Sequence, residues 1–317
     1  MQVNIATSLM DDIVQQYNLN VRKRQLVVAT AKSVQFFSYP QLDKSIFNLQ
    51  IADNNDKNAI YALTVIPGMT EKRIAFTTRH GKLYVVDSQG NLIRQTKVSD
   101  ESLLHVTYAQ IEGHTYILAC CTDRTIRVFT PSGRQLATIE TPDKVLSIDI
   151  YKYDGRVKMG GGMQNHSAVC LWDVHDIITK QDATPQAILS GGEKPAFSTK
   201  FITIMGETWF VHGCWDSRLY FYRQPFKNTD KILSPARYLR KNYSCYLRGR
   251  DQIYHIHEVM ISGVPYILAG TEKGYILAWR LVPLRNNNPP SHVIDRLNTR
   301  VRCMTIAKID GQQILFA

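Results

Sequence analysis

Short apolar segments alternate with polar turns along the whole chain. Glycine-bearing turns follow one another at intervals of 42 to 57 residues, at Gly68, Gly113, Gly155, Gly206, Gly263 and Gly311. Soon after most of them comes an apolar segment that ends in a small residue, with three nearly interchangeable copies at 116–119, 266–269 and 314–317. A period of this length is typical of stacked or radially arranged repeats.

A second polar turn and another apolar segment complete this pattern in each repeat. The turns include Thr122–Arg124, Trp215–Ser217 and Glu272–Gly274. Asp and Gly tolerate the positive φ that short hairpin turns require, so the pattern predicts antiparallel hairpins and no helices. The segments after these turns, five of which end in an aromatic residue, are Val34–Phe37, Leu83–Val86, Ile126–Phe129, Val169–Trp172, Leu219–Tyr222 and Ile276–Trp279.

The repeats predict an all-β protein, a β-propeller of about seven four-stranded blades that forms a single domain over residues 1–317. A more variable fourth segment, such as Gln135–Glu140, completes each blade. The aromatic side chains should fill the space between blades, each contributing about 1.5 to 3 kcal/mol when fully buried. Because one blade alone cannot bury both faces, ring closure would stabilise the fold. The aromatic residues expected between blades are Phe37, Phe129, Trp172, Tyr222 and Trp279.

These residues resemble the WD-repeat family of β-propellers. Trp172-Asp173 matches the family's Trp-Asp dipeptide, and Asp123 and Asp216 stand at the place of its tight-turn aspartate. The family's Gly-His pair is missing from the blade entries, since Gly113-His114 lies in a different turn. The resemblance covers nearly the whole chain at the level of the fold. It implies a rigid ring that displays loops to other proteins.

The last repeat is shorter than the others. Seven candidate second strands precede only six third strands, and the chain ends at Ala317, where earlier copies continue into a turn and a third strand. The sequence therefore predicts an incomplete last blade, so that the chain is part of a longer one or another strand fills the gap. We expect residues 3–8 to supply the closing outer strand of that blade, with one strand still missing.

Positive charge is in excess, with 38 Lys and Arg against 27 Asp and Glu and a net charge of +11. This balance favours an acidic partner, whether nucleic acid, an anionic membrane face or an acidic protein. No apolar run is long enough for a transmembrane helix and no secretory signal is apparent, which favours an intracellular protein, cytoplasmic or nuclear. The six cysteines lack CxxC spacing, so we expect buried thiols and neither a disulfide framework nor a zinc ribbon.

The predicted partner-binding site is the basic stretch 231–250, which contains no Asp or Glu. Guanidinium groups interleaved with tyrosine rings suit phosphate contacts with base stacking, or an acidic peptide with an aromatic anchor. The alternative is a solvated loop whose arginine stems cover apolar surface. The candidate residues are Lys231, Arg237, Tyr238, Arg240, Lys241, Tyr243, Tyr246, Arg248 and Arg250.

Signs of catalysis are weak, and we predict no catalytic residue, metal or cofactor. His255 and His257 share one face of a predicted strand, but no third metal ligand accompanies them. Gly160–Gly162 lacks the spacing of a phosphate-binding loop and is expected to allow close blade packing. The favoured function is a non-catalytic protein-interaction scaffold within a larger intracellular assembly. The alternatives are an RNA-associated propeller subunit that binds through the basic loop, and an enzyme whose site is assembled from several blades.

Overall fold

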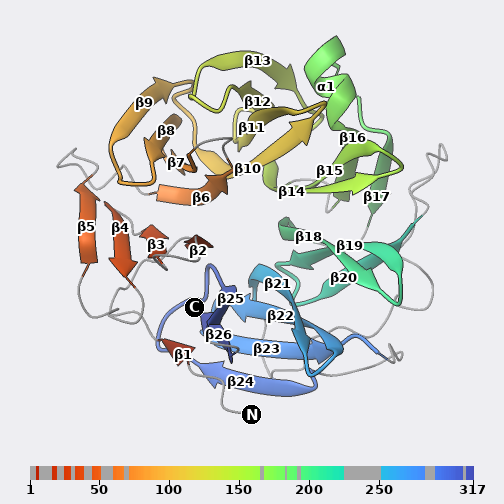
Figure 1. The fold of residues 1–317 in the computed structure, drawn as a ribbon. Helices are drawn as coiled ribbons and strands as arrows, with labels where there is room; N and C mark the ends of the chain where they lie inside the picture. Colours follow the sequence, from red (N-terminus) through yellow and green to blue (C-terminus); the bar gives the residue numbers. More distant parts are fainter. Residues whose placement is uncertain are drawn as a thin grey trace. The chain divides into compact units, whose positions relative to one another are not determined.

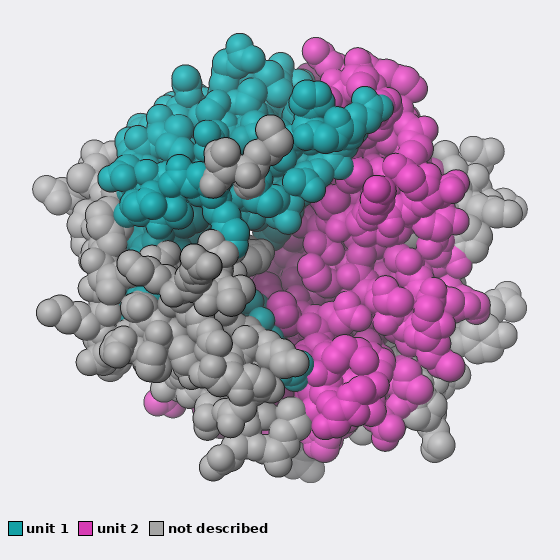
Figure 2. All heavy atoms as spheres, viewed as in Figure 1, with its two compact units in different colours: residues 1–138, 303–317 teal, residues 139–302 magenta. Residues whose placement is uncertain are grey.

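Strands make up most of the molecule, so the predicted all-β class is confirmed. The computed structural model describes residues 5–6, 16–19, 25–29, 33–38, 45–50, 60–67, 71–164, 168–182, 184–190, 194–224, 251–282, 290–309 and 312–317. The chain forms two compact units, which Figure 2 shows in teal and magenta. Unit 1 comprises residues 1–138 and 303–317, and unit 2 comprises residues 139–302.

Three four-stranded sheets of unit 1 are simple meanders, in which strands consecutive in the chain are hydrogen-bonded neighbours (Figure 1). The third of these sheets ends in a strand that crosses the boundary between the two units. The strands are β2 (Gln16–Leu19), β3 (Gln25–Ala29), β4 (Ser33–Ser38) and β5 (Ser45–Gln50); β6 (Ile60–Ile66), β7 (Arg73–Thr78), β8 (Lys82–Asp87) and β9 (Leu92–Lys97); and β10 (Leu103–Ile111), β11 (His114–Cys121), β12 (Thr125–Phe129) and β13 (Gln135–Glu140).

The remaining sheet of unit 1 joins the two ends of the chain. It has the order β1 (Ile5–Ala6), β26 (Gln312–Phe316) and β25 (Thr305–Ile309). The N-terminal segment therefore joins the last sheet, but it lies directly beside β26, where the other sheets have their third strand, and not at the outer position that we expected. β1 runs parallel to β26, with Ile5 opposite Leu315. It covers an edge of β26 whose backbone groups would otherwise lack strand partners.

Unit 2 contains three further meanders. Two have four strands and one has three strands among the residues that the structure describes. The strands are β14 (Val145–Tyr153), β15 (Arg156–Met163), β16 (Ala168–Asp173) and β17 (Ala187–Ser190); β18 (Ala196–Ile204), β19 (Glu207–Cys214) and β20 (Leu219–Arg223); and β21 (Ile253–Ile261), β22 (Val264–Thr271), β23 (Tyr275–Arg280) and β24 (His292–Arg296). A short helix, α1 (Val174–Lys180), connects β16 to β17 and was not expected from the sequence.

In four sheets, the hairpin between the first and second strands turns through two residues that both have positive φ. The glycine pattern predicts these turns. In each turn the second residue is the predicted glycine, with φ of 72 to 80°, and the first has φ of 49 to 51°. Such turns match the right-handed twist of the strands that they connect. The turns are Glu112-Gly113, Asp154-Gly155, Met205-Gly206 and Ser262-Gly263.

Four of the five predicted core aromatics are buried, namely Phe129, Trp172, Tyr222 and Trp279. The prediction for Phe37 is wrong, because Phe37 is only half-buried and its neighbour Phe36 is the buried ring. Adjacent side chains on a strand point to opposite faces. Phe36 faces the apolar cluster shared with the next sheet, where it joins Val34 and Phe76.

Apolar clusters fill the space between consecutive sheets within each unit. In unit 1, one cluster joins the β2–β5 sheet to the β6–β9 sheet, and another, which contains Phe129, joins β6–β9 to β10–β13. In unit 2, Tyr222 lies in the cluster between β16–β17 and β18–β20, and Trp279 lies in the one between β18–β20 and β21–β23. The β6–β9 and β18–β20 sheets therefore bury both faces.

Glycines near the ends of second strands allow the following segment to approach closely. A Cβ at Gly162 would overlap the carbonyl oxygen of Ala196, at the start of β18. Gly213 stands at the corresponding place in β19, and a Cβ there would crowd the side chain of Ile253. The close packing that the sequence predicts for Gly160–Gly162 is confirmed.

Candidate functional site

The basic stretch predicted to bind a partner lies outside the described residues. This applies to each of its candidate residues, Lys231, Arg237, Tyr238, Arg240, Lys241, Tyr243, Tyr246, Arg248 and Arg250. That hypothesis stays a prediction. The described residues contain three other polar or aromatic clusters that could carry function.

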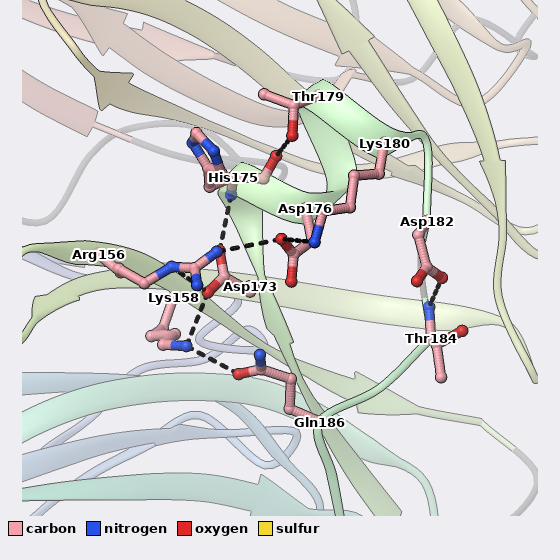
Figure 3. A network of polar contacts seen from close by, with 10 residues as sticks. All are labelled: Arg156, Lys158, Asp173, His175, Asp176, Thr179, Lys180, Asp182, Thr184 and Gln186. Atoms are coloured by element: carbon pink, nitrogen blue, oxygen red, sulfur yellow. Dashed lines mark hydrogen bonds and ion pairs between the residues drawn. The ribbon is translucent and has the colours of Figure 1, made fainter.

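The first cluster surrounds Asp173, the aspartate of the Trp-Asp dipeptide (Figure 3). Its side chain is 1% exposed and forms ion pairs with Arg156 Nε at 2.7 Å and Lys158 Nζ at 2.8 Å. Its Oδ1 atom accepts a hydrogen bond from the backbone N–H of His175 at 2.9 Å, which caps the N-terminus of α1. A buried carboxylate requires such partners, because removal from water is costly.

The same network fastens α1 to the sheet. Arg156 also pairs with Asp176 at 3.1 Å, and Lys180 pairs with Asp176 at 3.0 Å (Figure 3). These two cations lower the pKa of Asp176, with the hydrogen bond from Lys180 as the largest cause. Lys158 donates its other hydrogen bond to Gln186 Oε1 at 2.8 Å. Because the charges satisfy one another within the molecule, this cluster holds the helix in place.

The turn aspartates to which the family resemblance points also act locally. Asp216 accepts hydrogen bonds from the Tyr220 hydroxyl at 2.6 Å and from the Arg218 backbone N–H at 3.1 Å. Asp123 accepts hydrogen bonds from Thr125 and Arg127. Each aspartate ties its turn to the strand that follows it.

The second cluster links the first strands of unit 2. These strands form one edge of each sheet, so alternate backbone N–H groups have no strand partner. Side chains from the neighbouring sheets accept hydrogen bonds from these groups. Asp149 Oδ2 accepts from Phe201 at 2.7 Å, Ser198 Oγ accepts from Ile256 at 3.0 Å, and Glu258 Oε1 accepts from Thr203 at 3.3 Å.

Three ionisable residues occupy equivalent positions on these strands. Asp149, Lys200 and His257 stand opposite Gly160, Val211 and Leu268 of their second strands. Lys200 Nζ lies 3.2 Å from Asp149 Oδ1, and this carboxylate raises the pKa of Lys200. Burial, with a smaller effect of Lys200, lowers the pKa of His257 to about 4.

His255 and His257 lie on the same strand, β21. The two rings are nearly parallel, with centroids 6.3 Å apart. Among the residues that the structure describes, no group of three or more His, Cys, Asp or Glu side chains could hold a metal ion.

The third cluster consists of Phe197, Trp215 and Tyr254, all of which are only half-buried. They come from the start of β18, the turn after β19 and the start of β21. The Phe197 and Trp215 rings stack with centroids 5.4 Å apart, and Tyr254 meets Phe197 edge to face at 5.1 Å. Aromatic side chains that stay partly exposed together are typical of binding surfaces.

Charged groups flank the aromatic cluster. The pKa of Tyr254 is raised, first by burial and then by the charge of Glu272, while Arg300 and Arg302 act in the opposite direction. The Tyr254 hydroxyl donates a hydrogen bond to Gln252 Oε1 at 3.2 Å, and the backbone carbonyl oxygen of Gln252 accepts a hydrogen bond from the Glu272 N–H at 2.9 Å. The Val301 N–H donates a hydrogen bond to the carbonyl oxygen of Thr271 at 2.9 Å, so Arg300 and Arg302 flank a residue that is held against β22 beside Glu272. Arg300 and Arg302 are exposed. We call Phe197, Trp215, Tyr254, Arg300 and Arg302 the aromatic–arginine surface.

Neither the row of ionisable residues nor the aromatic–arginine surface was predicted from the sequence. Aligning the first strands at their hairpin glycines would have placed Asp149, Lys200 and His257 in one row. No comparable signal connects Trp215 to Arg300, because they lie in turns of different repeats.

The sequence was compared with models of protein families and with individually curated proteins, and neither comparison gives a match. No helix within the described residues is long and apolar enough to cross a membrane. The fold and the site define an all-β protein of repeated sheets with a partly exposed aromatic surface.

Proposed function

We propose that this protein is a non-catalytic interaction scaffold, a WD-repeat-like β-propeller of about seven blades in a larger intracellular assembly. In this proposal a protein partner binds to the aromatic–arginine surface. The observation that carries it is the cluster of three half-buried rings beside exposed arginines.

The packing within each unit supports a propeller. Consecutive sheets share the same strand order and bury apolar clusters between them. Radial repetition of such sheets would give every sheet a neighbour on both faces. A closed ring is therefore the arrangement that this proposal expects for the complete fold.

The residue types on the surface support a protein partner. Tyr, Trp, Phe and Arg are enriched at the centres of protein interfaces, and a few such residues supply most of the binding energy. Here they come from three separate segments that the sheets of unit 2 hold together. A rigid surface loses little conformational entropy when it binds.

The proposal is tested by partner capture with the full chain carrying Trp215→Ala. The matched control is Tyr153→Ala, which removes an aromatic side chain that is 44% exposed at the hairpin between β14 and β15. We expect Trp215→Ala to lose partners that the wild-type chain and Tyr153→Ala both retain, as measured by mass spectrometry of material captured from the native cell. Equal capture by all three proteins would reject this surface, provided that their melting temperatures agree.

The net charge of +11 favours a second candidate, an RNA-associated subunit. Phosphate-driven binding weakens steeply with increasing salt concentration, whereas binding in an apolar pocket responds little. Titration of single-stranded RNA at several salt concentrations distinguishes these cases. A steep salt slope that disappears when Arg237, Arg240 and Lys241 are replaced by glutamate would support RNA binding through the basic stretch.

A further inference from the structure

We propose that the aromatic–arginine surface binds an extended acidic peptide, with an apolar or aromatic side chain against the rings and a carboxylate on Arg302. This inference rests on the proposed function and names the chemistry of the partner. Three observations support it: the geometry of the rings, the ion pair that Arg300 forms and Arg302 lacks among the described residues, and the position of the Glu272 carboxylate.

The rings suit a side chain better than a stack of bases. Phe197 and Trp215 lie face to face with an interplanar angle of 20°, so each covers one face of the other. Tyr254 stands against Phe197 at an interplanar angle of 70°. Ring edges attract the face of another aromatic ring and also pack well against aliphatic groups. Successive bases need a series of free ring faces, which this compact cluster does not provide.

The two arginines differ in their partners. Arg300 lies 3.5 Å from Glu272 Oε1, and its side chain is 49% exposed. Arg302 forms no ion pair with any residue that the structure describes, and it is exposed. A guanidinium group binds a carboxylate through two parallel hydrogen bonds. Arg302 is therefore the group to which an incoming carboxylate would bind.

Glu272 favours a peptide over nucleic acid. Its carboxylate lies 3.5 Å from Arg300, and its backbone N–H donates a hydrogen bond to Gln252, whose side chain accepts one from the Tyr254 hydroxyl. A nucleic acid would place successive phosphates beside this negative charge, and like charges that meet at an interface disfavour binding. A peptide can place one carboxylate on Arg302 while Glu272 keeps Arg300 as its partner.

The experiment measures fluorescence anisotropy of labelled peptides with the full chain. The probe is a short peptide of alternating phenylalanine and glutamate. One reference peptide has lysine in place of glutamate, and another has alanine in place of phenylalanine. We expect the probe to bind and the two reference peptides not to bind. Arg302→Glu should weaken binding of the probe about tenfold or more, because a hydrogen bond to a charged group is lost and a like charge takes its place.

The matched control is Arg280→Glu, which reverses the charge of another exposed arginine of unit 2. Arg280 is the last residue of β23, whereas Glu272 lies in the turn before the first residue of this strand. It should leave the affinity unchanged. Arg302→Glu should instead gain affinity for the lysine peptide, a result that misfolding cannot produce. Phe197→Leu keeps an apolar side chain, so it should reduce the affinity for the probe less than Trp215→Ala does.

Equal affinity of wild type and Arg302→Glu for the probe would overturn the inference, and so would the absence of probe binding. Displacement of the probe by single-stranded RNA, with the same dependence on Arg302, would overturn it in favour of nucleic acid. None of these results excludes that Trp215 is needed to capture a native partner. The proposed function is therefore tested separately.

Discussion

The carboxylate of Asp149 on β14 accepts a hydrogen bond from the backbone N–H of Phe201 on β18, at 2.7 Å. The bond joins the first strands of two consecutive sheets of unit 2. The other carboxylate oxygen of Asp149 lies 3.2 Å from Lys200 Nζ, so the Asp149 side chain is the partner of both a backbone N–H and a cation. The edge of β18 is thereby closed to pairing with a foreign strand at this point.

Replacing Asp149 should destabilise unit 2. In Asp149→Ala, the Phe201 N–H and Lys200 both lose their partner, and we expect the free energy of unfolding to fall by about 1 to 3 kcal/mol. Asp149→Asn keeps an oxygen for Phe201 but loses the charge, so its loss should be smaller. Urea denaturation measures both values, with Asp100→Ala, at a fully exposed position, as the control. An identical midpoint for Asp149→Ala and the control would contradict this role.

Replacing Asp173 should loosen α1. Asp173→Ala removes the helix N-cap and leaves Arg156 and Lys158 without their shared partner, which should cost at least about 2 kcal/mol. Asn is also a good N-cap residue, so Asp173→Asn should keep the helix and lose only the ion pairs. Hydrogen exchange of the α1 amides should therefore be faster in Asp173→Ala than in Asp173→Asn. Equal exchange in the two variants would argue against the capping role.

The stability of the protein should fall with acid because of His212. Burial lowers the pKa of this histidine from 6.5 to about 3. Between these values the unfolded chain binds a proton that the folded chain does not. The free energy of unfolding therefore decreases as the pH falls below 6.5, by up to about 1.4 kcal/mol per pH unit for this group.

Urea titrations between pH 4 and 7 test this dependence. His257, whose pKa is lowered to about 4, contributes in the same direction, so the slope should be reduced and not abolished in His212→Gln. His114 is exposed, and His114→Gln serves as the control. If both variants keep the wild-type slope, His212 does not carry the effect.

The described cysteines should be inert in the folded protein. All five are buried thiols, and burial raises the pKa of Cys214 to about 12 and that of Cys121 to about 11. At pH 8 the thiols of Cys214 and Cys121 are therefore protonated and poor nucleophiles, and burial keeps a reagent from all five. In a Cys245→Ser background, which removes the cysteine outside the described residues, a thiol reagent should label the protein only after urea is added. Rapid labelling of the native chain would show that a buried thiol is accessible.

The sequence by itself determined the hairpins, because their cause is local. Positive φ at Gly113, Gly155, Gly206 and Gly263 is favoured by the lack of a side chain, and each of these turns brings the two apolar segments beside it into antiparallel register. Burial of Trp172 and Trp279 was predictable for a related reason, since large rings recur at one strand position in the repeats.

Local pattern failed where the two faces of a strand compete. Phe36 and Phe37 are adjacent and both aromatic, and only the packing of the next sheet decides which ring is buried. Helix α1 was missed because its start depends on the N-cap Asp173, which the sequence pattern identified only as the second residue of the Trp-Asp dipeptide. The parallel pairing of β1 with β26 joins segments about 300 residues apart, and no local signal specifies its direction.

The candidate sites depend on tertiary structure to a greater extent. Asp149 and Phe201 are separated by about fifty residues, and their hydrogen bond exists because two sheets stack with their first strands side by side. Phe197, Trp215 and Tyr254 likewise come from three segments that no periodicity connects. A sequence specifies its turns and strands through neighbouring residues, whereas the surface that a partner meets is formed only when the sheets pack.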